Sequence, residues 1–283
     1  MSVAIGGFTV DGVVWVEEEK IGGVAVDVYY PSNDKANFSV LMIHGMFAGG
    51  WCFEDWARFL CRKGIKVYVI KDLHSGYDIS KIKFEDYVDK VGFLLKKLMW
   101  DEYVAKPKPI IIGHSMGGLI IQKLAERYPH LVGGIILVVS APPKGISAMS
   151  WSVAKAMFKH LPSLIFNLPL KIDRESTFKL LLNWLGGDEK KEQIFKKFVP
   201  ESSRVAKQLA FSQIPVDEKK VNCEVLVVAG LYDKLLPRGI QIKIANKYDS
   251  VYLSFLKGHM MMLDDDRNQV INAIYDWIAA IER

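Results

Sequence analysis

Residues 110–125 read IIIGHSMGGLIIQKLA and place one serine between glycines at a change of periodicity. The isoleucines before Gly113 form a short apolar run, which is typical of a strand buried on both faces. Beyond Ser115 the apolar residues recur at helical spacing. A chain that turns this sharply from strand to helix crowds positions 113 and 117 together, so both must be glycine. The glycines therefore permit the turn, and the turn holds the Ser115 hydroxyl clear of the backbone.

This turn suits a nucleophile. A reactive serine needs an exposed oxygen, a base within reach and donors for a developing oxyanion. The backbone N–H of Met116, at the start of the helix, points toward incoming negative charge. The alternative is a glycine-rich turn whose serine only caps the helix. The position between a predicted strand and a predicted helix favours Ser115 as a nucleophile.

Apolar periodicity extends the pattern along the chain. Residues 8–18 and 23–30 alternate in the manner of strands around Gly22-Gly23, which predicts an antiparallel hairpin. Strand and helix patterns then alternate, which predicts an α/β fold with a mostly parallel, doubly wound sheet and helices on both faces. The predicted strands cover 38–43, 66–70, 109–113, 133–140, 224–230 and 250–256. The predicted helices cover 51–62, 84–100, the segment from the Ser115 turn to about residue 128, 237–248 and 265–281.

One long segment interrupts the alternation. Between Pro142 and Asn222 the sequence shows amphipathic helical patches, punctuated by proline and glycine, and no strand signal. We therefore expect one α/β core domain made of residues 1–141 and 223–283, with residues 142–222 as a helical cap inserted between them.

Composition excludes several classes of protein. Half of the 283 residues are apolar and 24% are charged, as in a globular protein with a large core. The net charge of +5 comes without a dense basic tract, so we expect no nucleic-acid partner. No signal peptide or long apolar span is evident, which argues against stable membrane insertion. Cys52, Cys61 and Cys223 cannot all pair, which favours reduced thiols in the cytoplasm. No cluster has metal-ligand spacing, so we expect no metal and no cofactor.

The G-x-S-x-G pattern at 113–117 resembles the nucleophile elbow of the α/β-hydrolase superfamily, in its serine esterase and lipase-like branch. The chain order serine, acid, histidine of that superfamily implies His259 as the base, directly behind the last predicted strand. Asp233 lies in GLYDKLLP, which resembles the superfamily's G-x-x-D-x-x-x-P segment and implies the orienting acid. The strand at 133–140 ends without an acid, and Asp264–Asp266 fit the N-terminus of the last helix better.

The stretch HGMF at 44–47 is similar to the superfamily's H-G-x loop. The resemblance implies the Met46 amide as the second oxyanion donor beside Met116, with Phe47 as a neighbouring candidate. The alternative is an ordinary strand-to-helix turn. The resemblance departs at 72–80, DLHSGYDIS, where many relatives carry a Gly-His-Gly turn. The remaining histidines His74, His130 and His160 are assigned no role.

Together these features predict a serine hydrolase that cleaves carboxylic esters through an acyl-enzyme. The apolar residues of 142–222 favour a hydrophobic acyl or aromatic group, monoacylglycerols included. The expected substrate contacts are Phe47, Trp151, Phe158, Phe166 and Trp184. The same triad serves C–C bond hydrolases, perhydrolases, acyltransferases and hydroxynitrile lyases, and a non-catalytic binding module on the same fold is the alternative from another class. The sequence leaves homo-oligomer formation open.

Overall fold

The computed structural model describes residues 14–33, 38–101, 107–149 and 151–281. Its centre is an eight-stranded sheet in the order β1-β2-β4-β3-β5-β6-β7-β8. β1 and β2 form an antiparallel hairpin, β2 pairs antiparallel with β4, and every other neighbouring pair is parallel. This confirms the predicted α/β class and its N-terminal hairpin. The strands are β1 (Val14–Ile21), β2 (Val24–Pro31), β3 (Ser39–Ile43), β4 (Lys66–Ile70), β5 (Ile110–His114), β6 (Gly134–Val138), β7 (Glu224–Gly230) and β8 (Val251–Phe255).

The predicted strands lie within a few residues of the observed ones. Residues 8–13 of the first predicted strand lie outside the described residues. The central strand β5 explains why its sequence is apolar without alternation. Ile111 packs into the core on one face of the sheet, whereas Ile110 and Ile112 pack into the core on the other. Both faces are covered, so neighbouring residues are buried in opposite directions.

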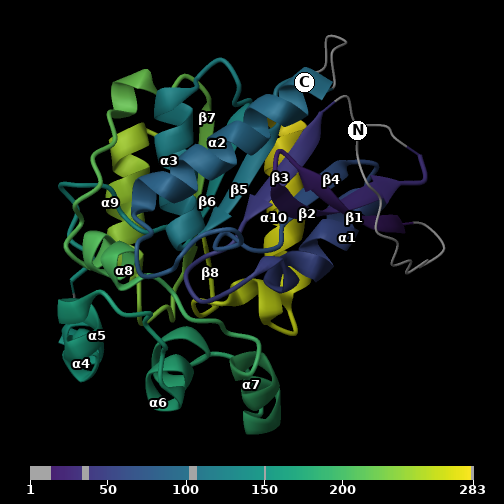
Figure 1. The fold of residues 1–283 in the computed structure, drawn as a ribbon. Helices are drawn as coiled ribbons and strands as arrows, with labels where there is room; N and C mark the ends of the chain where they lie inside the picture. The colour runs from purple at the N-terminus through teal and green to yellow at the C-terminus, as the bar shows by residue number, and fades with distance from the viewer. Residues whose placement is uncertain (1–13, 34–37, 102–106, 150, 282–283) are drawn as a thin grey trace.

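Helices cover both faces of the sheet (Figure 1). One core contains residues of α2 (Phe84–Asp101), α3 (Met116–Arg127) and α9 (Arg238–Tyr248). The other contains residues of α1 (Glu54–Arg62) and α10 (Arg267–Ile281), with the short 3₁₀ helices η1 (Gly50–Phe53) and η4 (Met261–Leu263) beside them. Each fully buried leucine or isoleucine of these helices contributes about 1.5–3 kcal/mol through removal of apolar surface from water.

Between β6 and β7 the chain is helical, as the sequence predicts. It forms α4 (Trp151–Lys159), α5 (Leu161–Phe166), α6 (Arg174–Ser176), a π-helical turn η2 (Thr177–Leu181), α7 (Asp188–Phe195), α8 (Ser203–Ala210) and a 3₁₀ turn η3 (Glu218–Lys220). The only β-type pairing within this segment's described residues is an isolated bridge between Leu170 and Glu201. Figure 1 shows α4 to α7 at one end of the sheet. That end is formed by the carboxyl ends of the parallel strands, where α/β proteins place their sites.

Candidate active site

Ser115 occupies a strained turn between β5 and α3. Its φ of 53° and ψ of −116° lie where a residue with a side chain is rarely found. Backbone bonds hold the turn in place. The Ser115 amide donates to Val138 O at 3.0 Å, and the Ser115 carbonyl accepts from the amides of Gly118 and Ala141 at 3.0 and 2.9 Å. Bonds to β6, to the segment directly after it and to α3 therefore hold the strained turn in place.

The glycines around Ser115 are sterically required, as the sequence predicts, but Gly117 is required by the neighbouring strand β3 and not by position 113. A Cβ on Gly113 would lie 2.4 Å from Gly117 O, as expected for crowding across the turn. A Cβ on Gly117 would lie 2.2 Å from Ile43 O, at the end of the neighbouring strand β3. A Cβ on Gly118 would collide with the Ser140 side chain at 2.3 Å. Helix α3 therefore passes closer to β3 and to the end of β6 than any side chain would allow.

His259 and Asp233 form a buried pair after β8 and β7. The His259 Nδ1–H group donates to Asp233 Oδ2 at 2.8 Å. The other carboxylate oxygen accepts from the amides of Leu235 and Leu236 at 2.8 and 2.9 Å. The Asp233 side chain is fully buried, and His259 is 2% exposed. These bonds fix one orientation of the imidazole and leave its Nε2 without a carboxylate partner.

His114, which sequence reasoning leaves without a role, packs beside His259. Their ring centroids are 4.8 Å apart, and His114 Nε2 lies 3.0 Å from the His259 carbonyl oxygen. Burial lowers the pKa of His114 well below its ordinary value. The ring is therefore neutral, and its Nε2–H donates to that carbonyl. Its position next to the serine in the elbow was the sequence signal that could have found this support for the His259 loop.

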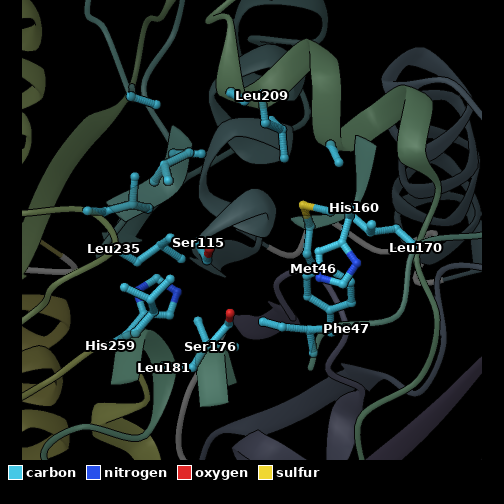
Figure 2. A pocket seen from close by; sticks show the side chains of 18 of the residues that line it. Met46, Phe47, Ser115, His160, Leu170, Ser176, Leu181, Leu209, Leu235 and His259 are labelled. Carbon is cyan, nitrogen blue, oxygen red and sulfur yellow. The ribbon is translucent and has the colours of Figure 1, made fainter. Parts of the chain in front are cut away.

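Ser115 and His259 border the same cavity, and Figure 2 shows them at one end of it. Among the described residues no direct hydrogen bond joins the Ser115 hydroxyl to the His259 ring. Hydrogen bonds of this kind are often long without substrate and tighten when substrate binds. The structure thus brings the predicted serine, histidine and aspartate together at one sheet edge.

The start of α3 and the loop after β3 carry the two candidate amide donors. Met116 begins α3, and the first amides of a helix have no partner within it. Met46 and Phe47 follow β3 and line the cavity with Ser115. Phe47 has a φ of 64°, and its carbonyl accepts from Val199 N at 2.9 Å. The loop after β3 is therefore held from the side of the helical insertion.

The cavity holds about 1080 Å³ of space, counted out to its open mouth, and is large enough for a small organic ligand. The strand ends form its floor and residues 142–222 form its roof. Most of the roof is aliphatic: Leu164, Leu170, Ile172, Leu180, Leu181 and Leu209. Such walls favour an apolar group beside Ser115.

The structure does not bring all predicted contact residues to this cavity. Phe47 lines it. Phe158 and Phe166 do not, because their side chains are 75% and 71% exposed on the outer faces of α4 and α5. Trp184 stacks on Tyr232 with ring centroids 4.2 Å apart and lies outside the cavity lining. The Trp151 side chain lies outside the described residues.

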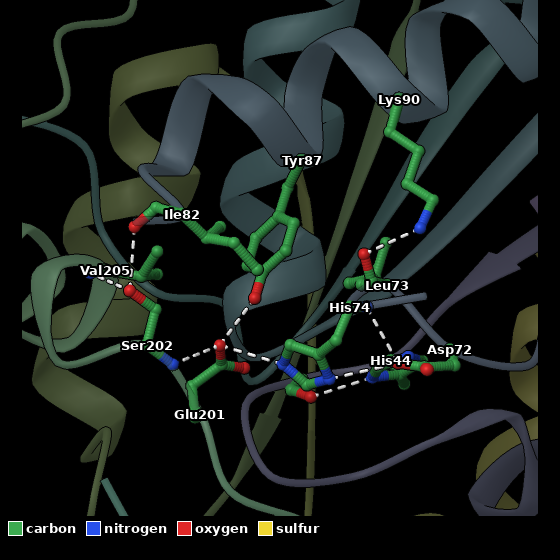
Figure 3. A network of polar contacts seen from close by, with 11 residues as sticks. His44, Asp72, Leu73, His74, Ile82, Tyr87, Lys90, Glu201, Ser202 and Val205 are labelled. Atoms are coloured by element: carbon green, nitrogen blue, oxygen red, sulfur yellow. Dashed lines mark hydrogen bonds and ion pairs between the residues drawn. The ribbon is translucent and has the colours of Figure 1, made fainter. Parts of the chain in front are cut away.

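Two histidines without a predicted role belong to polar clusters at or near the cavity. His160 lines the cavity itself. His74 lies in a buried network with Asp72 and Glu201 (Figure 3). His74 Nδ1 is 3.0 Å from Asp72 Oδ1, and Nε2 is 2.9 Å from Glu201 Oε1, off the line of an ideal hydrogen bond. The Tyr87 hydroxyl also donates to Glu201 Oε1, at 2.5 Å.

This network carries charge inside the protein. Glu201 is fully buried. Burial alone would lower the pKa of His74, but the two carboxylates outweigh burial and raise it to about 9. Because Glu201 belongs to the helical insertion and His74 to the loop after β4, the pair joins the two. The departure of residues 72–80 from the superfamily pattern was the one feature of the sequence that pointed to this network.

Within the described ranges, no group of three or more His, Cys, Asp or Glu side chains is arranged to hold a metal ion. In the same described ranges, no helix is both long enough and apolar enough to cross a bilayer.

Curated relatives match only part of the chain. Norfluorocurarine synthase 1 of Strychnos nux-vomica is 28% identical over 48% of this chain and 46% of its own length. Salicylic acid-binding protein 2 of Nicotiana tabacum is 28% identical over 39% of this chain and 42% of its own length. The chain thus matches less than half the length of these relatives.

A solved structure with a similar fold is the thermophilic esterase of Thermogutta terrifontis, with a TM-score of 0.70 and 18% identity over 100% of both chains. At this identity the likeness concerns the fold. The sequence model of a hydrolase family, described as serine aminopeptidase S33, matches residues 34–255. With its sheet order and its strand–turn–helix around Ser115, this chain belongs to that family within the α/β-hydrolase superfamily.

Proposed function

We propose that the protein is a serine hydrolase that cleaves carboxylic esters with a hydrophobic acyl or aromatic group. The observation that carries this proposal is the arrangement of Ser115, on its strained turn, and the buried His259–Asp233 pair around one largely aliphatic cavity. In this proposal residues 142–222 act as the cap over a core domain of residues 1–141 and 223–283.

The reaction proceeds in two steps. The Ser115 oxygen attacks the ester carbonyl carbon while His259 Nε2 takes its proton, and the Met46 and Met116 amides donate to the oxyanion. His259 then returns the proton to the departing alcohol, which leaves an acyl group on Ser115. Water attacks this acyl-enzyme while His259 takes its proton, and His259 then returns that proton to the Ser115 oxygen as the bond to the acyl group breaks and the acid is released. Asp233 keeps the proton on Nδ1 and stabilises the imidazolium that forms.

The cavity fits a neutral ester better than a peptide N-terminus, although the family takes its name from aminopeptidases. An amino terminus carries an ammonium group that needs a carboxylate within the site. No Asp or Glu is among the described residues that line the cavity.

The test uses a fluorophosphonate probe followed by peptide mapping. We expect covalent labelling at Ser115 and loss of labelling in Ser115→Ala. Turnover of p-nitrophenyl esters from acetate to palmitate then gives the chain-length preference. Folded protein that takes up no probe would refute the serine mechanism. Labelled protein that cleaves none of these esters would refute the ester assignment and favour C–C bond hydrolysis.

A further inference from the structure

The roof of the cavity is aliphatic except at two polar side chains of its described residues, His160 and Ser176. Figure 2 shows the His160 ring across the cavity from Ser115 and the Ser176 hydroxyl directed into it. Neither side chain takes part in the proposed reaction. A polar group on an otherwise aliphatic wall is poorly solvated unless something binds it, so both side chains require an explanation.

Asp173 holds both residues in place from behind. Its Oδ1 accepts from the Ser176 amide at 3.0 Å. Its Oδ2 lies 3.4 Å from His160 Nε2, an ion-pair distance without hydrogen-bond alignment. The backbone amide of Thr177 also donates to the Asp173 carbonyl, at 2.9 Å. The aspartate therefore fixes the helix start that carries Ser176 and faces one nitrogen of the imidazole.

The position of Asp173 determines which His160 nitrogen can meet a ligand. Nε2 is closed to solvent and faces the carboxylate, which favours a proton on that nitrogen. Nδ1 then has a free lone pair, and among the described residues nothing donates to it. The Ser176 hydroxyl lies beside the same aspartate, and its interaction with the carboxylate helps to lower the pKa of Asp173. His160 and Ser176 thus place two polar side chains, both next to Asp173, on an aliphatic wall opposite Ser115.

We propose that His160 and Ser176 form a subsite that binds a hydroxyl group of the substrate, with His160 Nδ1 as the acceptor. The substrate class is then a hydroxylated ester: an apolar group fills the aliphatic part of the cavity, and a hydroxyl group near the scissile bond meets the subsite. This inference rests on the proposed ester hydrolysis and names its preferred substrates. His160 and Ser176 are specificity residues, because they touch the substrate away from the reacting atoms.

The test compares matched esters that differ by one hydroxyl. On the alcohol side these are 2-hydroxyethyl butyrate and propyl butyrate, and on the acyl side the p-nitrophenyl esters of a hydroxylated and an unsubstituted acid. We expect the wild-type protein to favour the hydroxylated member of one pair in kcat/KM. His160→Leu should reduce that preference about tenfold and leave turnover of the unsubstituted ester within about threefold.

Two further variants separate recognition from folding. His160→Asn keeps an acceptor near the position of Nδ1 and should restore part of the preference. His130→Leu makes the same change at an exposed histidine outside the cavity and should leave kcat/KM for both esters unchanged. Equal losses on both esters in His160→Leu, or an unchanged preference, would overturn the subsite while ester hydrolysis stands.

A binding measurement keeps the two proposals distinguishable. Ser115→Ala protein, which cannot turn over, is titrated with each ester by calorimetry. Tighter binding of the hydroxylated ester that disappears in Ser115→Ala/His160→Leu would support the subsite even if no ester were cleaved by the wild-type protein. Equal affinity for both esters in the Ser115→Ala protein would overturn it.

Discussion

The protein buries two histidine–carboxylate pairs near the same end of the sheet, and they differ in what surrounds the second ring nitrogen. His259 binds Asp233 through Nδ1, and its Nε2 has no carboxylate partner. The residue lines the same cavity as Ser115. His74 has a carboxylate at each nitrogen, Asp72 at one and Glu201 at the other. A ring with one free nitrogen can take up and return a proton, whereas a ring held between two carboxylates stays a cation.

The difference shows that burial and a carboxylate neighbour do not by themselves make a histidine catalytic. His74 is not free to exchange a proton with a substrate. Its contact with Glu201 instead connects the loop after β4 to the helical segment between β6 and β7 (Figure 3). Changes at His259–Asp233 should therefore affect turnover, whereas changes at the His74 network should affect stability.

The largest effect should follow from His259→Ala. Without a base the serine oxygen keeps its proton, so we expect kcat for p-nitrophenyl butyrate to fall by about 10⁴-fold or more. The control is His130→Ala, at an exposed histidine. Turnover within about tenfold of wild type, in correctly folded His259→Ala, would remove His259 from the mechanism.

Asp233→Asn should have the next largest effect on turnover. An amide can donate to the ring and favour the wrong tautomer, with the proton on Nε2, so kcat should fall by about 10³- to 10⁴-fold. Circular dichroism checks that the fold is retained, and the ester assay is the same. A loss smaller than about tenfold would mean that His259 keeps its orientation without the carboxylate.

Glu201→Gln should have little of its effect on the chemistry and most of it on stability. It leaves His74 with only the half-exposed Asp72 carboxylate, and breaking a buried pair costs about 3 kcal/mol in the free energy of unfolding. Urea denaturation measures this value. The matched control is Glu54→Gln, at an exposed glutamate paired with Arg58, where we expect less than about 1 kcal/mol.

The same network predicts a pH dependence of wild-type stability. The folded-state pKa of His74, about 9, exceeds its ordinary value of 6.5. Its contribution is therefore complete below pH 6.5 and is lost as the pH rises toward 9, by about 3 kcal/mol in total. Urea denaturation across this range should show the decline in wild type and a much smaller one in Glu201→Gln. Equal slopes in both proteins would contradict the assignment of charge to His74.

Asp72→Asn should have the smallest effect. The Asp72 side chain is 47% exposed, whereas Glu201 is fully buried, and solvent screens its attraction to His74. Asparagine also keeps the oxygen that accepts from the His74 amide. We expect the free energy of unfolding to fall by about 1 kcal/mol or less in urea denaturation. A loss equal to that of Glu201→Gln would mean that exposure does not govern these two pairs.

Sequence reasoning succeeded where the determining interactions are local. The crowding at Gly113 and the turn at Ser115 involve residues within a few positions of one another. The resemblance to the superfamily implied Asp233 and His259, and each directly follows a predicted strand, where parallel strands end at a common edge. The described residues of 142–222 contain no strand, which was likewise visible in local periodicity.

It failed where a side chain's surroundings depend on distant segments. Phe158 and Phe166 looked like cavity residues by composition, but the orientation of α4 and α5 turns them outward and places His160 in the cavity instead. Nothing near His74 in the sequence indicates Glu201, because that contact exists only once the helical insertion packs against the loop after β4.

The sequence by itself therefore determined the α/β architecture and the strained serine turn, because periodicity and glycine sterics act over a few residues. Its resemblance to the superfamily implied the chain order of the three candidate catalytic residues. The tertiary structure alone decided which faces of the inserted helices line the cavity and which histidine lies between two carboxylates. Those outcomes depend on packing between segments far apart in the chain, and a sequence pattern carries no record of it.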